Sequence, residues 1–131
     1  MQEGLAMKNM GKISAFNAVL MLAGLVANIG HAQDAEHGKS VFKACAACHA
    51  TDRANRVGPG LGGILGREAG TAPGFRYSNA MKNSGIVWDN TTVSAFLESP
   101  QKAVPGTRMP YAGLKDATDR ADVISYLSTL K

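Results

Sequence analysis

Apolar residues recur at helical spacing in three segments of the chain, and no segment shows the alternation of a half-buried strand. In the first segment, residues 35–47, the side chains of Val41, Phe42 and Cys45 fall on one side of the predicted helix. Gly38 falls on the same side, although glycine destabilises a helix interior. We therefore expect another backbone to approach this helix closely at Gly38.

Two more helices are predicted toward the C-terminus. Capping residues at 89–92 begin one helix, and Pro100 ends it. The last helix begins near Thr118 and carries an apolar stripe. The stripe consists of Val123, Ile124, Leu127 and Leu130. Because the glycine-rich residues 51–74 lack periodicity, we expect them to form a wrapping loop with a short helical turn. The predicted fold class is all-α.

A secretory signal peptide is predicted for residues 1–32, which leaves residues 33–131 as one domain of 99 residues. Lys8 and Lys12 precede an apolar run of 17 residues, at positions 13–29. Residues 30–32, which end at Ala32, place small residues at the two positions that a signal peptidase recognises before its cleavage site. A retained membrane anchor is the alternative, although the run is short for a membrane span and two asparagines interrupt it. The candidate start residues are Met1, Met7 and Met10.

Composition narrows the class of protein further. Charged residues make up only 18% of the chain and no repeat is present, which indicates a compact domain rather than a disordered one. The net charge of +4 comes from scattered basic residues, so no nucleic-acid partner is expected. Two cysteines are too few for a disulfide scaffold or a four-thiolate metal site. A domain of 99 residues is small for a self-supporting core, so we expect a bound group to fill part of its interior.

Residues 45–49 read Cys-Ala-Ala-Cys-His, the CxxCH signature for attaching haem c. Two thiols on one helical turn can reach the two vinyl groups of a porphyrin, and His49 then lies under the iron. The carbonyl of Pro59 can accept a hydrogen bond from that imidazole. A thioredoxin-like site, a zinc site and a simple disulfide are alternatives. The sequence around Cys45 and Cys48 offers neither a βαβ pattern nor a second pair of metal ligands.

The opposite face of a haem iron is either open or filled by a side chain. The available ligands after the predicted cleavage site are Met81, Met109, His37 and the lysines. Met109 lies in a stiff loop between Pro105 and Pro110, which suits a ligand that must stay in place. Nothing near Met81 in the sequence fixes its approach, so we interpret it as filling space in the core. His37 is interpreted as a solvated residue on a polar helix face.

These motifs occur in an ordered series, and with them the chain resembles the small soluble class I cytochromes c of mitochondria and the bacterial periplasm. The likeness extends over nearly all of residues 35–131. The matching blocks are residues 38–42, 45–49, 58–63, 65–67, 72–78, 85–88, 97–100, 105–109 and 126–127. The segment 42–45 is one residue shorter than in mitochondrial members, which favours a bacterial relative.

The resemblance implies a cytochrome c fold, with a few helices and Gly/Pro-rich loops around one haem c that is covalently attached through Cys45 and Cys48. It implies iron ligation by His49 and Met109, and a hydrogen bond from His49 to the Pro59 carbonyl. It also implies contacts to the haem propionates, whose buried carboxylates need donors. The residues implied for these contacts are Arg67, Tyr77, Trp88 and Thr107.

Two positions depart from the pattern of the resembled family. Phe96 stands where many members have a tyrosine that donates a hydrogen bond near the ligand sulfur. Met81 stands where many have an asparagine in a buried water network. Both changes make the haem pocket less polar. Desolvation and the lost hydrogen bond act in opposite directions on the reduction potential, so the sequence gives no sign for the shift.

The resemblance implies a one-electron carrier and not an enzyme. Its expected partners are redox proteins with acidic docking patches, such as an oxidase, a bc1-type complex or a reductase, and any contact with a membrane complex is transient. A monomer in the periplasm is expected. The exposed cations that flank the haem edge would face such partners, and they are Lys43, Lys102, Arg108 and Lys115. An enzyme or gas sensor with an open iron site, and a haem-free domain with a lone disulfide, are the alternative functions.

Overall fold

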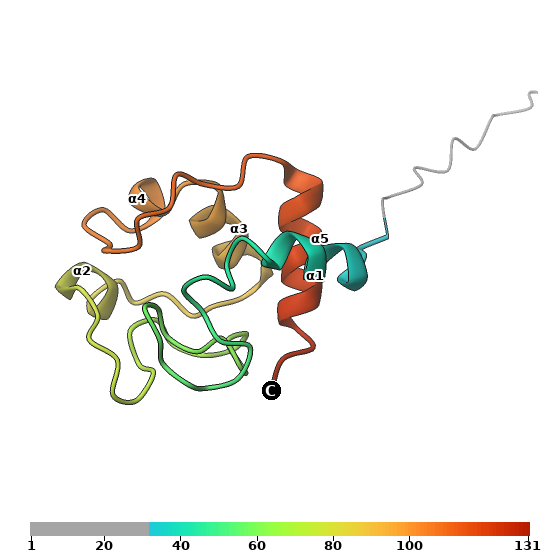
Figure 1. Ribbon diagram of the computed structural model, residues 1–131. Helices are drawn as coiled ribbons and strands as arrows, with labels where there is room; N and C mark the ends of the chain where they lie inside the picture. The colour runs from blue at the N-terminus through green and yellow to red at the C-terminus, as the bar shows by residue number, and fades with distance from the viewer. Residues whose placement is uncertain (1–31) are drawn as a thin grey trace, which may run out of the picture.

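The computed structural model describes residues 32–131, so the predicted signal peptide lies outside the described residues except for Ala32. Helices in this part of the chain alternate with long irregular segments, as Figure 1 shows. They are α1 (Ala35–Phe42), α2 (Asn79–Lys82), α3 (Asn90–Glu98), α4 (Pro100–Ala103) and α5 (Ala117–Leu127). Within residues 32–131 the extended structure consists of one isolated bridge between Glu68 and Val87, so the predicted all-α class is confirmed. None of the described helices is long and apolar enough to cross a membrane.

Helix α1 packs across α5, and Gly38 lies where the two helices meet (Figure 1). A Cβ atom at Gly38 would overlap the backbone carbonyl of Asp122, so the expected close approach of a second backbone is confirmed. The helix is shorter than predicted, because it ends at Phe42 and a series of turns follows through residue 48.

The segment that follows the predicted helix at residues 89–99 contains a short helix that the sequence pattern did not reveal. Helix α3 begins with the predicted cap, in which the Asp89 side chain accepts from the Thr92 amide and the Thr92 side chain accepts from the Asp89 amide. It ends at Glu98, and Pro100 then begins the short helix α4 at a position where proline needs no amide hydrogen. Pro100 therefore both separates two helices and starts one.

Helix α5 begins at Ala117, one residue before the predicted start, with Asp116 as its cap. The predicted stripe is buried at Val123, Ile124 and Leu127. Leu130 is only partly buried and lies beyond the end of the helix. The stripe therefore predicted the buried face of α5 correctly but extended it past the helix.

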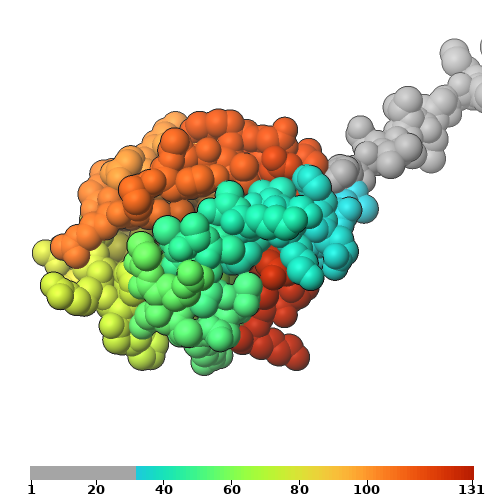
Figure 2. Space-filling view, viewed as in Figure 1, coloured from blue at the N-terminus to red at the C-terminus, as the bar shows by residue number. Residues whose placement is uncertain are grey.

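The glycine-rich residues 51–74 contain no helix and form the predicted loop. Backbone hydrogen bonds tie it to distant segments: the Gly63 amide donates to the Leu130 carbonyl at 3.2 Å, and the Gly66 amide donates to the Trp88 carbonyl at 2.7 Å. Figure 2 shows this loop, in green, beside the segment that follows α4, in orange. The loop thus forms one wall of a cavity in the interior of the domain.

Candidate haem-binding site

A cavity of about 430 Å³ lies between the loop, the helices and the segment that follows α4. Most of its lining is apolar, with Ile64, Val93 and Leu127 among the buried side chains that face it. Eight of the predicted site residues also line it: Cys45, Cys48, His49, Pro59, Tyr77, Trp88, Thr107 and Met109. Residues separated by up to 64 positions in the sequence are therefore gathered around one space.

The turn after α1 presents both cysteines to this cavity. The Cys45 amide donates to the Phe42 carbonyl at 2.8 Å, and the His49 amide donates to the Cys45 carbonyl at 3.0 Å, so the turn continues directly from the helix. Both cysteines are free thiols of intermediate burial in this structure. Burial raises the pKa of the Cys45 thiol, and the neighbouring Cys48 adds to the rise.

The ring of His49 is held by two features of the loop. Its Nδ1 atom lies 2.7 Å from the Pro59 carbonyl oxygen, an acceptor that fixes Nδ1 as the protonated nitrogen and leaves Nε2 with its lone pair. Gly58 lies against the ring, where any Cβ atom would collide with the imidazole. The crowding explains why a residue without a side chain precedes Pro59.

The loop that presents Met109 is held by backbone hydrogen bonds and by side chains. The Thr107 amide donates to the Val104 carbonyl at 3.0 Å, and the Tyr111 amide donates to the Met109 carbonyl at 2.9 Å. The Thr107 hydroxyl accepts from the Met109 amide at 3.5 Å, and Thr107 itself is buried. Gln101 of α4 donates from Nε2 to the Thr107 carbonyl at 2.8 Å and accepts from the Gly106 amide at 3.4 Å. Gln101 was not predicted as a supporting residue, because no sequence motif marks a glutamine whose side chain hydrogen-bonds to the backbone five and six residues later.

Tyr77 and Trp88 approach the cavity from different segments. The Tyr77 hydroxyl accepts from the Ala72 amide at 3.2 Å, which fixes the end of the phenol ring. The buried Trp88 ring meets the Phe96 ring edge-on, with their centres 5.2 Å apart. Arg67 differs from the other predicted site residues, because it lines a neighbouring surface pocket and donates from Nη2 to the Gly60 carbonyl at 2.8 Å.

Met81 and Phe96, the two departures from the family pattern, are both buried and both line the cavity. The interpretation of Met81 as a residue that fills space in the core is confirmed, because its side chain is buried in the hydrophobic core. Its amide donates to the Ser78 hydroxyl at 3.0 Å, and its carbonyl accepts from the Ser84 hydroxyl at 2.9 Å. Ser78 is the N-cap of the short helix α2, and Ser84 follows its C-cap Asn83; this helix was not predicted from the sequence.

His37 is more constrained than expected. The expectation of a solvated surface residue is confirmed, since about half of the side chain is exposed, but Nδ1 also lies 2.8 Å from the Asp122 carboxylate, which the sequence did not reveal. It lies on α1 and is not among the residues that line the cavity. Its partner is 85 residues away, so no local pattern could have revealed the pair.

The residues around the cavity fit haem c. Two unpaired thiols lie on one turn, an imidazole with a fixed tautomer follows them, and a thioether comes from a separate loop. The mostly apolar lining suits a flat porphyrin, and thioether and imidazole are ligands that haem iron accepts. The glycine at position 58 provides the space that the proximal imidazole needs.

Comparison with known proteins agrees with this geometry. The family model described as Cytochrome c matches residues 35–131. Cytochrome c of Euglena viridis is 50% identical over 100 residues, which cover 75% of this chain and 98% of the relative. Cytochrome c2 of Rhodomicrobium vannielii is 48% identical over 100 residues, which cover 75% of this chain and 80% of the relative.

The solved structure of cytochrome cH from Methylobacterium extorquens superposes with a TM-score of 0.71 at 42% identity, covering 73% of this chain and 98% of that one. Sequence, fold and site geometry therefore agree. The chain belongs to the cytochrome c family and is an electron carrier with a covalently attached haem c.

Proposed function

We propose that His49 and Met109 bind the haem iron from opposite faces and that Cys45 and Cys48 form the two thioether bonds. The observation that carries the assignment is the 2.7 Å contact between His49 Nδ1 and the Pro59 carbonyl, which reserves Nε2 of the same ring for the metal. Met109 lines the same cavity from a separate loop, so the two ligands come from segments that the chain folds together.

Four residues are proposed as donors toward the haem propionates. Their common feature is an N–H or O–H group on a side chain near the cavity, and they are Arg67, Tyr77, Trp88 and Thr107. A buried carboxylate without such donors would shift toward its neutral form because desolvation penalises charge. Arg67 acts from the neighbouring pocket, where its hydrogen bond to the Gly60 carbonyl holds the guanidinium beside the loop.

The arrangement favours electron transfer over catalysis. When bound, haem c supplies an iron that gains or loses one electron. The chain's own task is to keep a ligand on each face, so that no external substrate reaches the iron. The short α2, the α4 loop and the apolar side chains Met81 and Phe96 also exclude water from the cavity. The protein therefore has no turnover of its own.

The proposed partners are redox proteins with acidic docking patches, of the oxidase, bc1-type or reductase kind. Arg108 lines the cavity beside Met109 and is exposed, so it brings a positive charge to the edge of the site. Other exposed cations proposed for the same docking face are Lys43, Lys102 and Lys115. Such contacts are short-lived and depend on salt, because opposite charges steer the encounter. The carrier acts as a monomer.

The proposed location is the periplasm, reached after cleavage behind Ala32. Covalent haem attachment and the predicted signal peptide both fit an exported protein. Intact-mass measurement of the purified protein tests the cleavage. A mass that includes residues 13–29 would show a retained anchor instead.

Optical spectra of the haem-loaded protein test the ligand assignment. The oxidised protein should show the weak near-infrared band of a sulfur-to-iron bond, and Met109→Ala should abolish it. Met81→Ala is the matched control, because it removes a second buried thioether from the same cavity and should leave the band in place.

A high-spin spectrum without the band in the unmodified protein would contradict the assignment. Rapid binding of carbon monoxide by its reduced form would point to an open iron site, and the enzyme or sensor function would then replace the electron carrier.

A further inference from the structure

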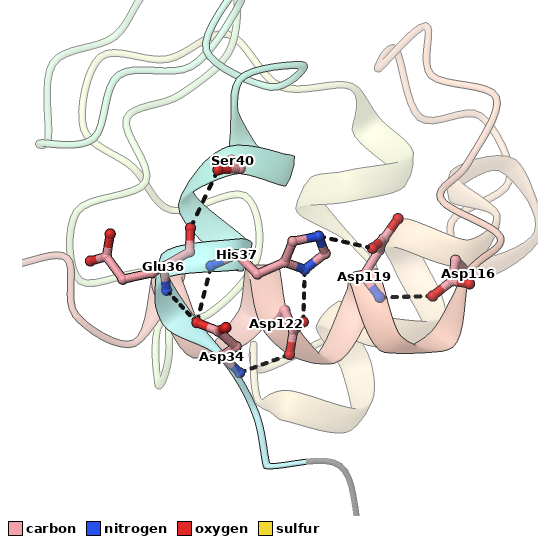
Figure 3. A network of polar contacts seen from close by, with 7 residues as sticks. All are labelled: Asp34, Glu36, His37, Ser40, Asp116, Asp119 and Asp122. Carbon is pink, nitrogen blue, oxygen red and sulfur yellow. Dashed lines mark hydrogen bonds and ion pairs between the residues drawn. The ribbon is translucent and has the colours of Figure 1, made fainter.

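The strongest unexplained feature outside the haem site is a buried carboxylate between α1 and α5. Asp122 of α5 is 1% exposed, yet it carries two contacts from the beginning of α1. The Asp34 amide donates to one of its oxygens at 2.8 Å, and Nδ1 of His37 lies 2.8 Å from the other. Figure 3 shows this network, with the His37 ring reaching from α1 onto α5.

The charges that face His37 all have the same sign. On α5, Asp122 is in direct contact, and an Asp119 oxygen lies 3.8 Å from Nε2. On its own helix, the capping Asp34 carboxylate also favours positive charge on the ring. Arg120, the basic residue of α5, points elsewhere, since it donates to the Leu114 and Lys115 carbonyls.

We propose that protonation of His37 strengthens the contact between α1 and α5, and that the haem-carrying turn after α1 is therefore held to the C-terminal helix in a pH-dependent way. When the ring is protonated, it bridges Asp122 and Asp119 as a cation. When the ring is neutral, Nδ1–H can still donate to Asp122, but the bond loses its charge assistance and the attraction to Asp119. The contact between α1 and α5 is then weaker, although it is not lost.

The connection to the haem site runs through the short helix α1. Phe42, its last residue, is buried and packs against Tyr126 of α5, with ring centres 5.3 Å apart. The Phe42 carbonyl accepts from the Cys45 amide, which begins the turn that carries both thiols and His49. Loosening α1 from α5 therefore frees the segment to which the haem is attached.

The direction of the pH dependence follows from the contacts. The hydrogen bond with Asp122 raises the pKa of His37 above 6.5, and the nearby Asp119 and Asp34 carboxylates add to the rise, while partial desolvation opposes it. A raised pKa in the folded state means that the stabilisation is fully present below the unfolded pKa of about 6.5. The stabilisation is lost as the pH rises through the pKa of the folded protein.

Two measurements on the haem-loaded protein test the proposal. The first is an NMR titration of the His37 ring, which should give a pKa above 6.5 that falls in Asp119→Asn. The second compares guanidinium unfolding midpoints near pH 5.5 and 8.5, on either side of the ordinary histidine pKa of about 6.5. The unmodified protein should lose more stability over this interval than His37→Gln, which keeps a donor but cannot titrate.

Lys39→Gln is the matched control, because it removes an exposed charge from the same helix and leaves the His37 contacts intact. It should show the same pH profile as the unmodified protein. A His37 pKa at or below 6.5 would overturn the proposal. Parallel pH profiles for the unmodified protein and His37→Gln would overturn it as well, even if both proteins fold normally.

Discussion

The two proposed iron ligands are supported in different ways. The proximal side, defined here as α1, α5 and residues 43–60, holds His49 mainly by backbone. The ring meets the Pro59 carbonyl and the bare Gly58, and its turn hydrogen-bonds to the end of α1. The distal side, defined as α4 and residues 104–111, holds Met109 by backbone hydrogen bonds within the loop and also depends on the side chains of Thr107 and Gln101.

This difference indicates that the two sides of the site differ in stiffness. His49 is held by backbone that can hardly move, whereas the loop that carries Met109 depends partly on side chains that can rotate. Backbone contacts such as the one at Gly38 tolerate almost no displacement, because neither partner can rotate away. The loop that carries Met109 can move more easily, because the two Gln101 hydrogen bonds and the Thr107 hydroxyl contact involve side chains, and each net hydrogen bond is worth about 1 kcal/mol. Changes on the proximal side should therefore affect folding, whereas changes on the distal side should affect Met109 ligation.

The largest effect is expected for Gly38→Ala. The added methyl group would overlap the Asp122 backbone, so α1 must move away from α5. A loss of about 3 kcal/mol in the free energy of unfolding is expected, at the upper end of the range for overpacking. Denaturant unfolding of the haem-loaded protein measures it, with Lys39→Ala as the control on the same helix. A loss no greater than that of the control would show that the α1–α5 contact is adaptable.

Gln101→Ala should have a smaller effect on folding and a larger one on the distal ligand. The Thr107 carbonyl and the Gly106 amide lose a partner, which should cost about 1 kcal/mol. Carbon monoxide should bind the reduced Gln101→Ala variant faster than it binds the reduced unmodified protein, because Met109 would leave the iron more often in the variant. Lys102→Ala is the control in the same helix and should leave the binding rate unchanged. If Gln101→Ala also leaves the rate unchanged, the loop is held by other contacts.

Removing the positive charges of Arg108 and Lys102 separates docking from ligation on the distal side. The double variant with glutamine at both positions should transfer electrons to an acidic partner several-fold more slowly at low salt, with little difference at high salt. Stopped-flow kinetics at several ionic strengths measure the slope. Lys39→Gln on α1 is the proximal control. An unchanged slope in the double variant would remove these two residues from the docking face.

The smallest effect is expected for Phe96→Tyr. Phe96 lines the cavity and packs on Trp88, so a hydroxyl group there would add one polar atom to an apolar wall. The added polarity and a new hydrogen bond near the ligand sulfur act in opposite directions on the potential, so we expect only a small shift. Redox titration measures it, and an unchanged potential would mean that the site is insensitive to this position.

Much of the site could be predicted from short stretches of sequence. The CxxCH motif gives the attachment turn and the proximal histidine within five residues, because its chemistry requires consecutive positions. The caps of α3 and the buried face of α5 were also predicted, since helix caps and apolar stripes depend on neighbours a few residues away. The helix over residues 35–47 was predicted too long, because apolar spacing continues into the turn after Phe42.

Contacts between distant segments could not be predicted in the same way. The contact of the exposed His37 with Asp122 was not predicted because Asp122 comes from another helix, and Gln101 was missed because its role depends on where the α4 loop closes. Arg67 lines a neighbouring pocket rather than the cavity that the other predicted site residues share, and no sequence pattern distinguishes it from them. The serines on both sides of Met81 hold the backbone of this core residue, and their role was not predicted.

The sequence by itself determined the haem chemistry, the family and the helical character of the domain, because these depend on residue types at short, fixed spacings. The tertiary structure alone decided which side chains share the cavity, how each proposed ligand is supported, and that a contact between His37 and Asp122 joins α1 to α5. The physical reason is that hydrogen bonds and close packing require atoms within a few ångströms, and only the folded chain brings residues 85 positions apart to that distance.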